Sequence, residues 1–117
     1  MTGMISQHYL LANSMEGVRQ NHEVISQNLA NVNTPGYKTR QLDFAEFMRQ
    51  IQDGTADKQM LKEIPVELVT GLQNRKDENN VNLDAQLGAL KKNSLLFQTY
   101  SQVLASKMAT ARRAMSR

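Results

Sequence analysis

Cysteine and tryptophan are both absent from this sequence of 117 residues, and proline occurs only twice. Without cysteine the chain has no disulfide, iron–sulfur cluster, thiolate nucleophile or cysteine-based zinc site. Only three phenylalanines and three tyrosines are present, so a core must be built from aliphatic residues and methionine. Apolar residues nevertheless make up 40% of the chain, which is typical of a folded protein. The length fits one domain at most.

Long apolar runs are missing as well. No apolar stretch approaches the ~20 residues needed to cross a bilayer, so we expect no membrane insertion. The N-terminal stretch MTGMISQHYLLANSMEGVRQ lacks a basic segment followed by an unbroken apolar one. We therefore expect no cleavable signal peptide.

Catalytic and metal-binding motifs are also lacking. The sequence contains no H-E-x-x-H, P-loop or G-x-S-x-G pattern. His8 and His22 would lie ~21 Å apart along a helix, too far to share a metal. Asp43 and Glu46 are better explained as a helix cap than as an acid–base pair. We predict a protein that is not an enzyme and has no cofactor, metal or catalytic site.

The N-terminal segment carries the clearest pattern, because its apolar residues recur at alternating spacings of four and three. Such a stripe stays aligned only if the helix supercoils against a partner helix. Two histidines in the stripe are interpreted as polar residues that help to fix register. The predicted interface residues of this helix are Leu11, Met15, Val18, Ile25 and Leu29.

A second stripe of the same spacing lies near the C-terminus. Helices over the two segments would be ~43 Å and ~50 Å long, so they could lie side by side. The C-terminal helix has apolar residues on more than one face, and single subunits rarely expose such patches without a purpose. We infer that the chain completes its core with copies of itself or related chains. The predicted interface residues here are Leu83, Leu87, Leu90, Phe97, Leu104 and Met108.

The pattern breaks at NLANVNTPGYK, residues 28–38. Four residues supply side chains that can bond the last carbonyls of the first helix: Asn28, Asn31, Asn33 and Thr34. Pro35 stops the helix, and Pro35-Gly36 suits a type II turn with glycine at positive φ. An ordinary polar loop explains these residues equally well from physics alone.

The central segment predicts short elements. Asp43 and Glu46 resemble a capping box that opens a short helix. Its apolar face would consist of Phe44, Phe47, Met48 and Ile51. Residues 53–59 are interpreted as a flexible linker, residues 64–69 as a short extended segment and residues 71–80 as a polar loop.

These elements predict a mainly α fold of one domain, with the two long terminal helices paired as an antiparallel coiled coil. We assign residues 1–34 to the N-terminal core helix and residues 35–80 to the turn, a short third helix and an irregular or extended central segment. Residues 81–117 form the C-terminal core helix.

The net charge of +3 is modest, and its distribution says more than its size. Lys107, Arg112, Arg113 and Arg117 complement the macrodipole at a helix C-terminus or, alternatively, form a patch for an acidic partner. A basic helical nucleic-acid-binding protein is an alternative. It is disfavoured because basic residues alternate with acids and are not interleaved with aromatic residues.

Two stretches resemble a known family. LANVNTPGYK (29–38) after a heptad helix is similar to the signature of the flagellar axial proteins, which are rod, hook and hook-associated subunits. Residues 77–115 look like the C-terminal region of the FlgB family of proximal rod proteins. The likeness there includes the segment Asn80-Val81-Asn82 and the segment Asn93-Ser94-Leu95. Residues 41–48, QLDFAEFM, are also similar to that family.

The resemblance implies a structural subunit of the basal-body rod in the bacterial flagellum, assembled helically after type III export and spanning the periplasm. Implied partners are other copies, other rod proteins, the ring–rod junction protein FliE, the MS ring and the export gate, with no nucleic acid. Another flagellar axial protein or a closed coiled-coil adaptor stays open as an alternative. The implied turn and assembly residues are Asn28, Asn31, Thr34, Pro35, Gly36 and Tyr37.

Overall fold

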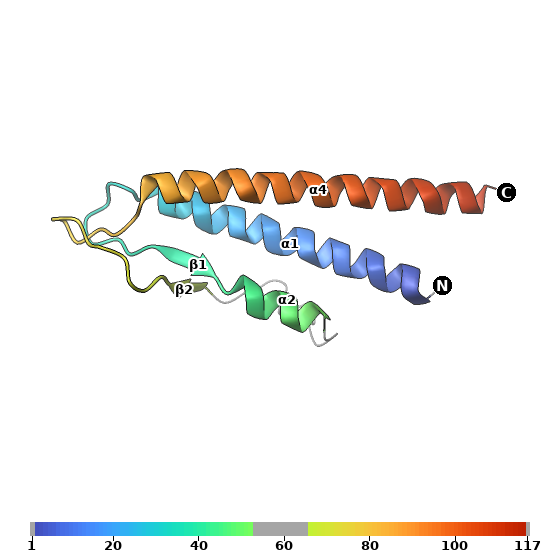
Figure 1. Cartoon of the computed structure of the whole chain (residues 1–117), viewed down its shortest axis with the longest axis horizontal. Helices are drawn as coiled ribbons and strands as arrows, with labels where there is room; N and C mark the ends of the chain where they lie inside the picture. Colours follow the sequence, from blue (N-terminus) through green and yellow to red (C-terminus); the bar gives the residue numbers. More distant parts are fainter. Residues whose placement is uncertain (1, 53–65, 117) are drawn as a thin grey trace.

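Two long helices run the length of the molecule in opposite directions (Figure 1). The computed structural model of the chain describes residues 2–52 and 66–116. Helix α1 spans Thr2–Ala30 and helix α4 spans Leu83–Met115, and the two pack against each other. The molecule measures 66 × 26 × 18 Å. The mainly α fold with paired antiparallel terminal helices is confirmed.

Both chain termini lie at one end of the helix pair, which we call the open end (Figure 1). The loops of residues 31–39 and 71–82 lie at the other end, which we call the closed end. Asn82 begins α4, since its side chain accepts a hydrogen bond of 3.0 Å from the Ala85 amide. Arg112 and Arg113 lie in the last turn of α4, where cations complement the helix dipole.

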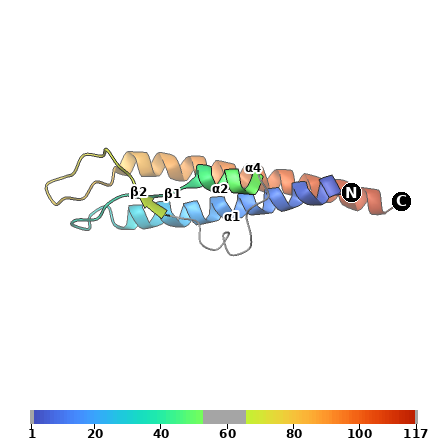
Figure 2. The same cartoon turned by 90° about the horizontal axis from the view of Figure 1, so that it is seen from below.

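The central segment forms short elements that cover one side of the helix pair (Figure 2). Strand β1 (Arg40–Leu42) pairs antiparallel with strand β2 (Val66–Leu68), and Gln41 lies opposite Glu67. Strand β2 falls within the extended segment predicted for residues 64–69. Strand β1 and helix α2 both pack against α1.

Helix α2 spans Phe44–Gln52 and begins where the sequence predicts. The Asp43 carboxylate accepts from the Glu46 amide at 3.4 Å, a long bond at the N-terminus of α2. Phe47, from the predicted apolar face, is 2% exposed. The side chains of the other three residues of that face and the predicted linker of residues 53–59 lie outside the described residues.

The apolar core is small and belongs mainly to α1. Within the described residues α4 contributes no buried apolar side chain, and its one buried residue is Asn93. On the α4 side, the contact between the two long helices is therefore made by half-buried and polar side chains. The buried apolar residues are Leu11, Val18, Val24, Ile25, Leu42, Phe47 and Val81.

Candidate assembly site

Asn28, in the last turn of α1, joins four parts of the chain. Its Nδ2 donates to the Arg40 carbonyl at 2.7 Å and to Gln86 Oε1 at 3.1 Å. Its Oδ1 accepts from the Arg40 amide at 3.1 Å and from the Tyr37 hydroxyl at 2.9 Å. An asparagine side chain offers two donors and two acceptor lone pairs, so all four are used. At 1% exposure, Asn28 fastens α1 to the turn, to β1 and to α4.

The predicted Pro35-Gly36 turn has the geometry of type II. The Tyr37 amide donates to the Thr34 carbonyl at 3.2 Å, and Gly36 has a φ of 75°. The Gly36 amide donates at 2.8 Å to the carbonyl of Asp77 from the second loop. The turn therefore connects the two loops of the closed end.

Asn79, which is fully buried, bonds carbonyls of the turn that follows α1. Asn79 Nδ2 lies 2.9 Å from the Asn31 carbonyl oxygen, 3.2 Å from that of Val32 and 2.8 Å from that of Thr34. Asn31 bonds the end of α1 as predicted, because its Nδ2 donates to the Gln27 carbonyl. The Thr34 hydroxyl donates to Asn31 Oδ1 and not to a helix carbonyl. The last carbonyls of α1 are thus bonded locally by Asn31 and Val32, whereas Asn79, a residue remote in sequence, bonds the carbonyls just beyond the helix.

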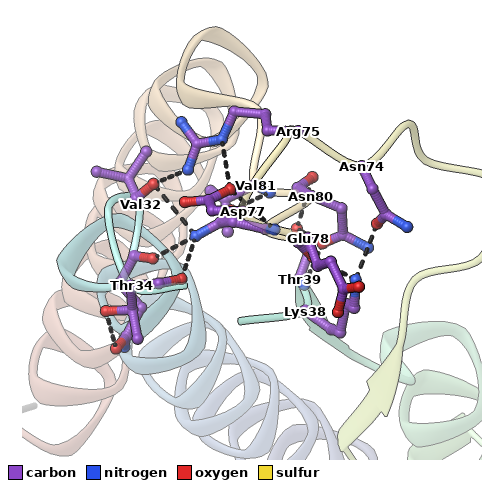
Figure 3. A network of polar contacts seen from close by, with 12 residues as sticks. Val32, Thr34, Lys38, Thr39, Asn74, Arg75, Asp77, Glu78, Asn80 and Val81 are labelled. Carbon is purple, nitrogen blue, oxygen red and sulfur yellow. Dashed lines mark hydrogen bonds and ion pairs between the residues drawn. The ribbon is translucent and has the colours of Figure 1, made fainter. Parts of the chain in front are cut away.

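The rest of the second loop is bonded to the first (Figure 3). Thr39 donates through its amide at 2.6 Å and its hydroxyl at 2.9 Å to Asn80 Oδ1. Lys38 Nζ donates to Asn74 Oδ1 at 2.9 Å and also to the Glu78 carbonyl. The Arg75 side chain donates to the Val32 carbonyl.

The sequence does not predict the contacts between Thr39 and Asn80 or those of Asn79, because the composition of residues 71–80 indicates only a polar loop. The available signal was the density of asparagine in DENNVN, residues 77–82. Asparagine side chains can replace backbone partners in a turn.

The predicted interface residues of α1 face the protein interior. Leu11, Val18 and Ile25 are buried, and Met15 and Leu29 are half-buried. Their spacing of three and four places them on one side of α1.

The predicted interface residues of α4 lie elsewhere. Leu83, Leu87, Phe97 and Met108 are 43–51% exposed, whereas Leu90 and Leu104 are half-buried. We call these six residues the α4 stripe. The stripe lies beside the face of α4 that meets α1, not within it. That inner face is offset by one residue along the sequence, and its buried or half-buried members include Gln86, Ala89, Asn93, Leu96 and Tyr100.

A groove of about 390 Å³ lies between the two long helices along part of the stripe. Val18, Arg19 and His22 line it from α1. Ser94, Phe97 and Gln98 are among its residues from α4. Because most of its exposed lining is apolar, the groove suits an apolar side chain of a neighbouring molecule.

The charged groups near the groove form local pairs. Arg19 contacts Glu16 at 2.7 Å and Glu23 at 3.6 Å. Hydrogen bonds from Arg19 lower the pKa of Glu16 below its ordinary value, and Gln20 lowers it further. On α2, hydrogen bonds from Arg49 lower the pKa of Glu46. Because these pairs are exposed, each contributes little to the free energy of unfolding.

Metal-binding and membrane-spanning features were sought in residues 2–52 and 66–116. Within these ranges no three acidic or histidine side chains gather closely enough to hold a metal ion. None of the helices described there combines the length and hydrophobicity of a membrane span.

Comparisons with known proteins agree with this geometry. Residues 11–38, which include most of α1 and the turn, match the family described as flagella basal body rod protein. The chain is 34% identical over 98 residues to the flagellar basal body rod protein FlgB of Aquifex aeolicus (strain VF5). That alignment covers 79% of this chain and 78% of the relative. The exposed α4 stripe, the turn that follows α1 and this coverage lead to one conclusion: the chain belongs to the flagellar basal body rod proteins, a structural family and not an enzyme family.

Proposed function

We propose that this chain is a subunit of the proximal rod and that the α4 stripe is its contact with neighbouring subunits. The carrying observation is the exposure of Leu83, Leu87, Phe97 and Met108 on one side of a helix whose other side already packs on α1. These residues follow the heptad spacing of a helix–helix interface.

Contact with a neighbouring subunit would bury the apolar side chains of the stripe and so stabilise the assembly. Fully burying a leucine, methionine or phenylalanine side chain contributes about 1.5–3 kcal/mol. The four exposed residues of the stripe are already about half covered, so each would contribute about 1 kcal/mol on contact with a neighbour. Such a gain is small for one pair of molecules and becomes large when every subunit repeats it along a shaft.

The finer assignments also belong to the proposal. The subunits would assemble helically in the periplasm-spanning rod after export through the flagellar type III apparatus, without a cleavable signal peptide. The proposed partners are other copies, other rod proteins, FliE at the ring–rod junction, the MS ring and the export gate. The turn residues Asn28, Asn31, Thr34, Pro35, Gly36 and Tyr37 support assembly by holding the closed end in one shape.

A pair of double variants tests the proposal in cells. Leu87→Gln with Phe97→Gln makes the stripe polar. Leu95→Gln with Val103→Gln makes the same kind of change at exposed positions of α4 outside the stripe. We expect the stripe variant to lose incorporation into isolated basal bodies and to lose motility, while the control assembles normally.

Protein level and thermal unfolding are measured for both variants. Because all four positions are exposed, we expect the free energy of unfolding to stay within about 0.5 kcal/mol of the parent chain. Normal rods from a folded stripe variant, or equal loss in both variants, would contradict the assignment of this surface.

A further inference from the structure

Two polar bridges connect the long helices away from the loops. Asn93 Nδ2 donates at 2.9 Å to the Val18 carbonyl, and Asn93 Oδ1 accepts at 3.0 Å from Asn21 Nδ2. Asn93 is 3% exposed. The second bridge joins Asn28 Nδ2 to Gln86 Oε1.

The bridges have the same spacing on both helices. Asn21 precedes Asn28 by seven residues, and Gln86 precedes Asn93 by seven residues. Each interval is one heptad, so the bridges occupy equivalent levels of one antiparallel packing pattern. The next level along this pattern pairs Ser14 with Tyr100.

We propose that Asn93, held by Asn21 and the Val18 carbonyl, is a register lock that fixes where α4 lies along α1 and excludes a shift by one heptad, whereas the Asn28–Gln86 bridge marks the same register without being sufficient to hold it. Apolar side chains at heptad spacing pack almost equally well after a shift of seven residues. A buried amide side chain does not tolerate such a shift, because its hydrogen-bond partners must lie directly opposite it on the other helix. This role replaces the one predicted for His22, which is exposed.

Neither possible shift by one heptad keeps both bridges. One shift places Asn28 opposite Asn93 but puts Asn21 opposite Tyr100 and carries Gln86 beyond the end of α1. The other places Asn21 opposite Gln86 and leaves Asn28 beyond the start of α4. An amide left unpaired at a buried level should reduce the shifted population by about one to two powers of ten.

The bond to the Val18 carbonyl adds a rotational constraint, because a main-chain oxygen occupies a fixed place on the helix. Asn93 therefore holds its own face of α4 toward α1, which leaves the adjacent α4 stripe outside the helix pair. The lock is a property of the single chain, so it is tested without rod assembly and stands or falls independently of the proposed function.

The absence of cysteine allows a direct crosslinking test in the full-length chain. Ser14→Cys with Tyr100→Cys reports the observed register. Ser14→Cys with Lys107→Cys reports one shift, and Val18→Cys with Ala89→Cys reports the other. A shifted pair lies about 10 Å out of level in the observed register, beyond the reach of a disulfide.

Each reporter pair is placed in the parent chain, in Asn21→Leu with Asn93→Leu, and in a control. The control, Ser26→Leu with Gln102→Leu, makes the same number of changes to leucine at exposed positions on the same helices. After mild oxidation, the disulfide yield of each pair is measured by mass spectrometry, and helix content is measured by circular dichroism.

We expect the parent and the control to crosslink at least about tenfold more at Ser14→Cys/Tyr100→Cys than at either shifted pair. In the double-leucine variant, at least one shifted pair should approach the yield of the native pair while helix content is retained. A native-only pattern in that variant would overturn the lock, as would equal yields at all pairs in the parent. If the leucine variant is unfolded, Asn93→Ala carries the same test with the same deciding outcomes.

Discussion

The two ends of the helix pair differ in which of their side chains find a partner within the single chain. At the closed end, buried polar atoms find their partners within the chain: Asn28 makes four hydrogen bonds and Asn79 bonds three carbonyls. Toward the open end, apolar side chains such as Met108 and Met115 stay exposed. The polar groups of the closed end are paired within the single chain, whereas the apolar stripe, which runs from Leu83 to Met108, lacks a covering surface.

This difference separates stability from assembly along the molecule. Removing a buried polar group strands its partners without water, so the closed end should control whether the chain folds. Removing an exposed apolar group costs the isolated chain little, so the stripe should control what the folded chain binds. The predictions that follow test this division, beginning with the largest effect.

Asn28→Ala should have the largest effect on folding. The substitution leaves four groups without their partner: the Gln86 side chain, the Tyr37 hydroxyl, and the amide and carbonyl of Arg40. Each of these groups that is buried away from water lowers the free energy of unfolding by about 1–3 kcal/mol when it is left unbonded. We expect the free energy of unfolding to fall by about 3–4 kcal/mol in urea titrations followed by circular dichroism.

Two controls frame that result. Asn33→Ala removes the same amide from an exposed position of the loop that follows α1, and Met108→Gln changes an exposed residue toward the open end. Both should stay within about 0.5 kcal/mol of the parent chain. A loss for Met108→Gln as large as that for Asn28→Ala would remove the distinction between the two ends.

Substitution of Gly36 should have an intermediate effect with a definite order. No atom lies within 4 Å of a Cβ built at Gly36, so its φ of +75° alone sets the cost. We expect Gly36→Asn to cost least, Gly36→Ala about 1 kcal/mol and Gly36→Val more, because β-branched residues tolerate positive φ worst. Thermal unfolding of the three variants measures the order, and equal melting temperatures would contradict the type II turn.

The fold was predictable in its main features because they depend on repeated patterns. Heptad spacing predicted both long helices, and Pro35-Gly36 predicted the turn between α1 and β1. The spacing did not identify the face of α4 that meets α1. Apolar residues lie on several sides of that helix, and the face selected in the single chain is the one that carries Gln86 and Asn93.

The polar network was less predictable because it depends on contacts that are remote in sequence. Asn79 bonds carbonyls 45 to 48 residues earlier in the chain, and Thr39 bonds Asn80 across an interval of 41 residues. A single sequence shows where the asparagines are but not which distant amide and carbonyl groups they bond. The predicted role of the turn residues in assembly stays a prediction.

The smallest expected effect is a dependence of stability on pH at the exposed ion pair of α1. Because Arg19 lowers the pKa of Glu16 from its ordinary value of 4.5, the charged carboxylate favours the folded state. This contribution is complete above the unfolded pKa and is lost as the pH falls through the lower folded pKa. After screening by solvent, it should amount to about 0.3 kcal/mol.

Glu16→Gln isolates this contribution, since glutamine keeps an acceptor for Arg19 but does not titrate. We expect the variant to unfold at a slightly lower temperature than the parent at pH 7, and the difference should shrink as the pH is lowered to 3, toward the lowered pKa of Glu16. Melting curves at both pH values measure it. A difference that persists unchanged at pH 3 would mean that Glu16 stabilises α1 by packing and not by charge. In either case the effect stays far below that of Asn28→Ala, because water can replace a partner at the surface of α1 and cannot do so inside the closed end.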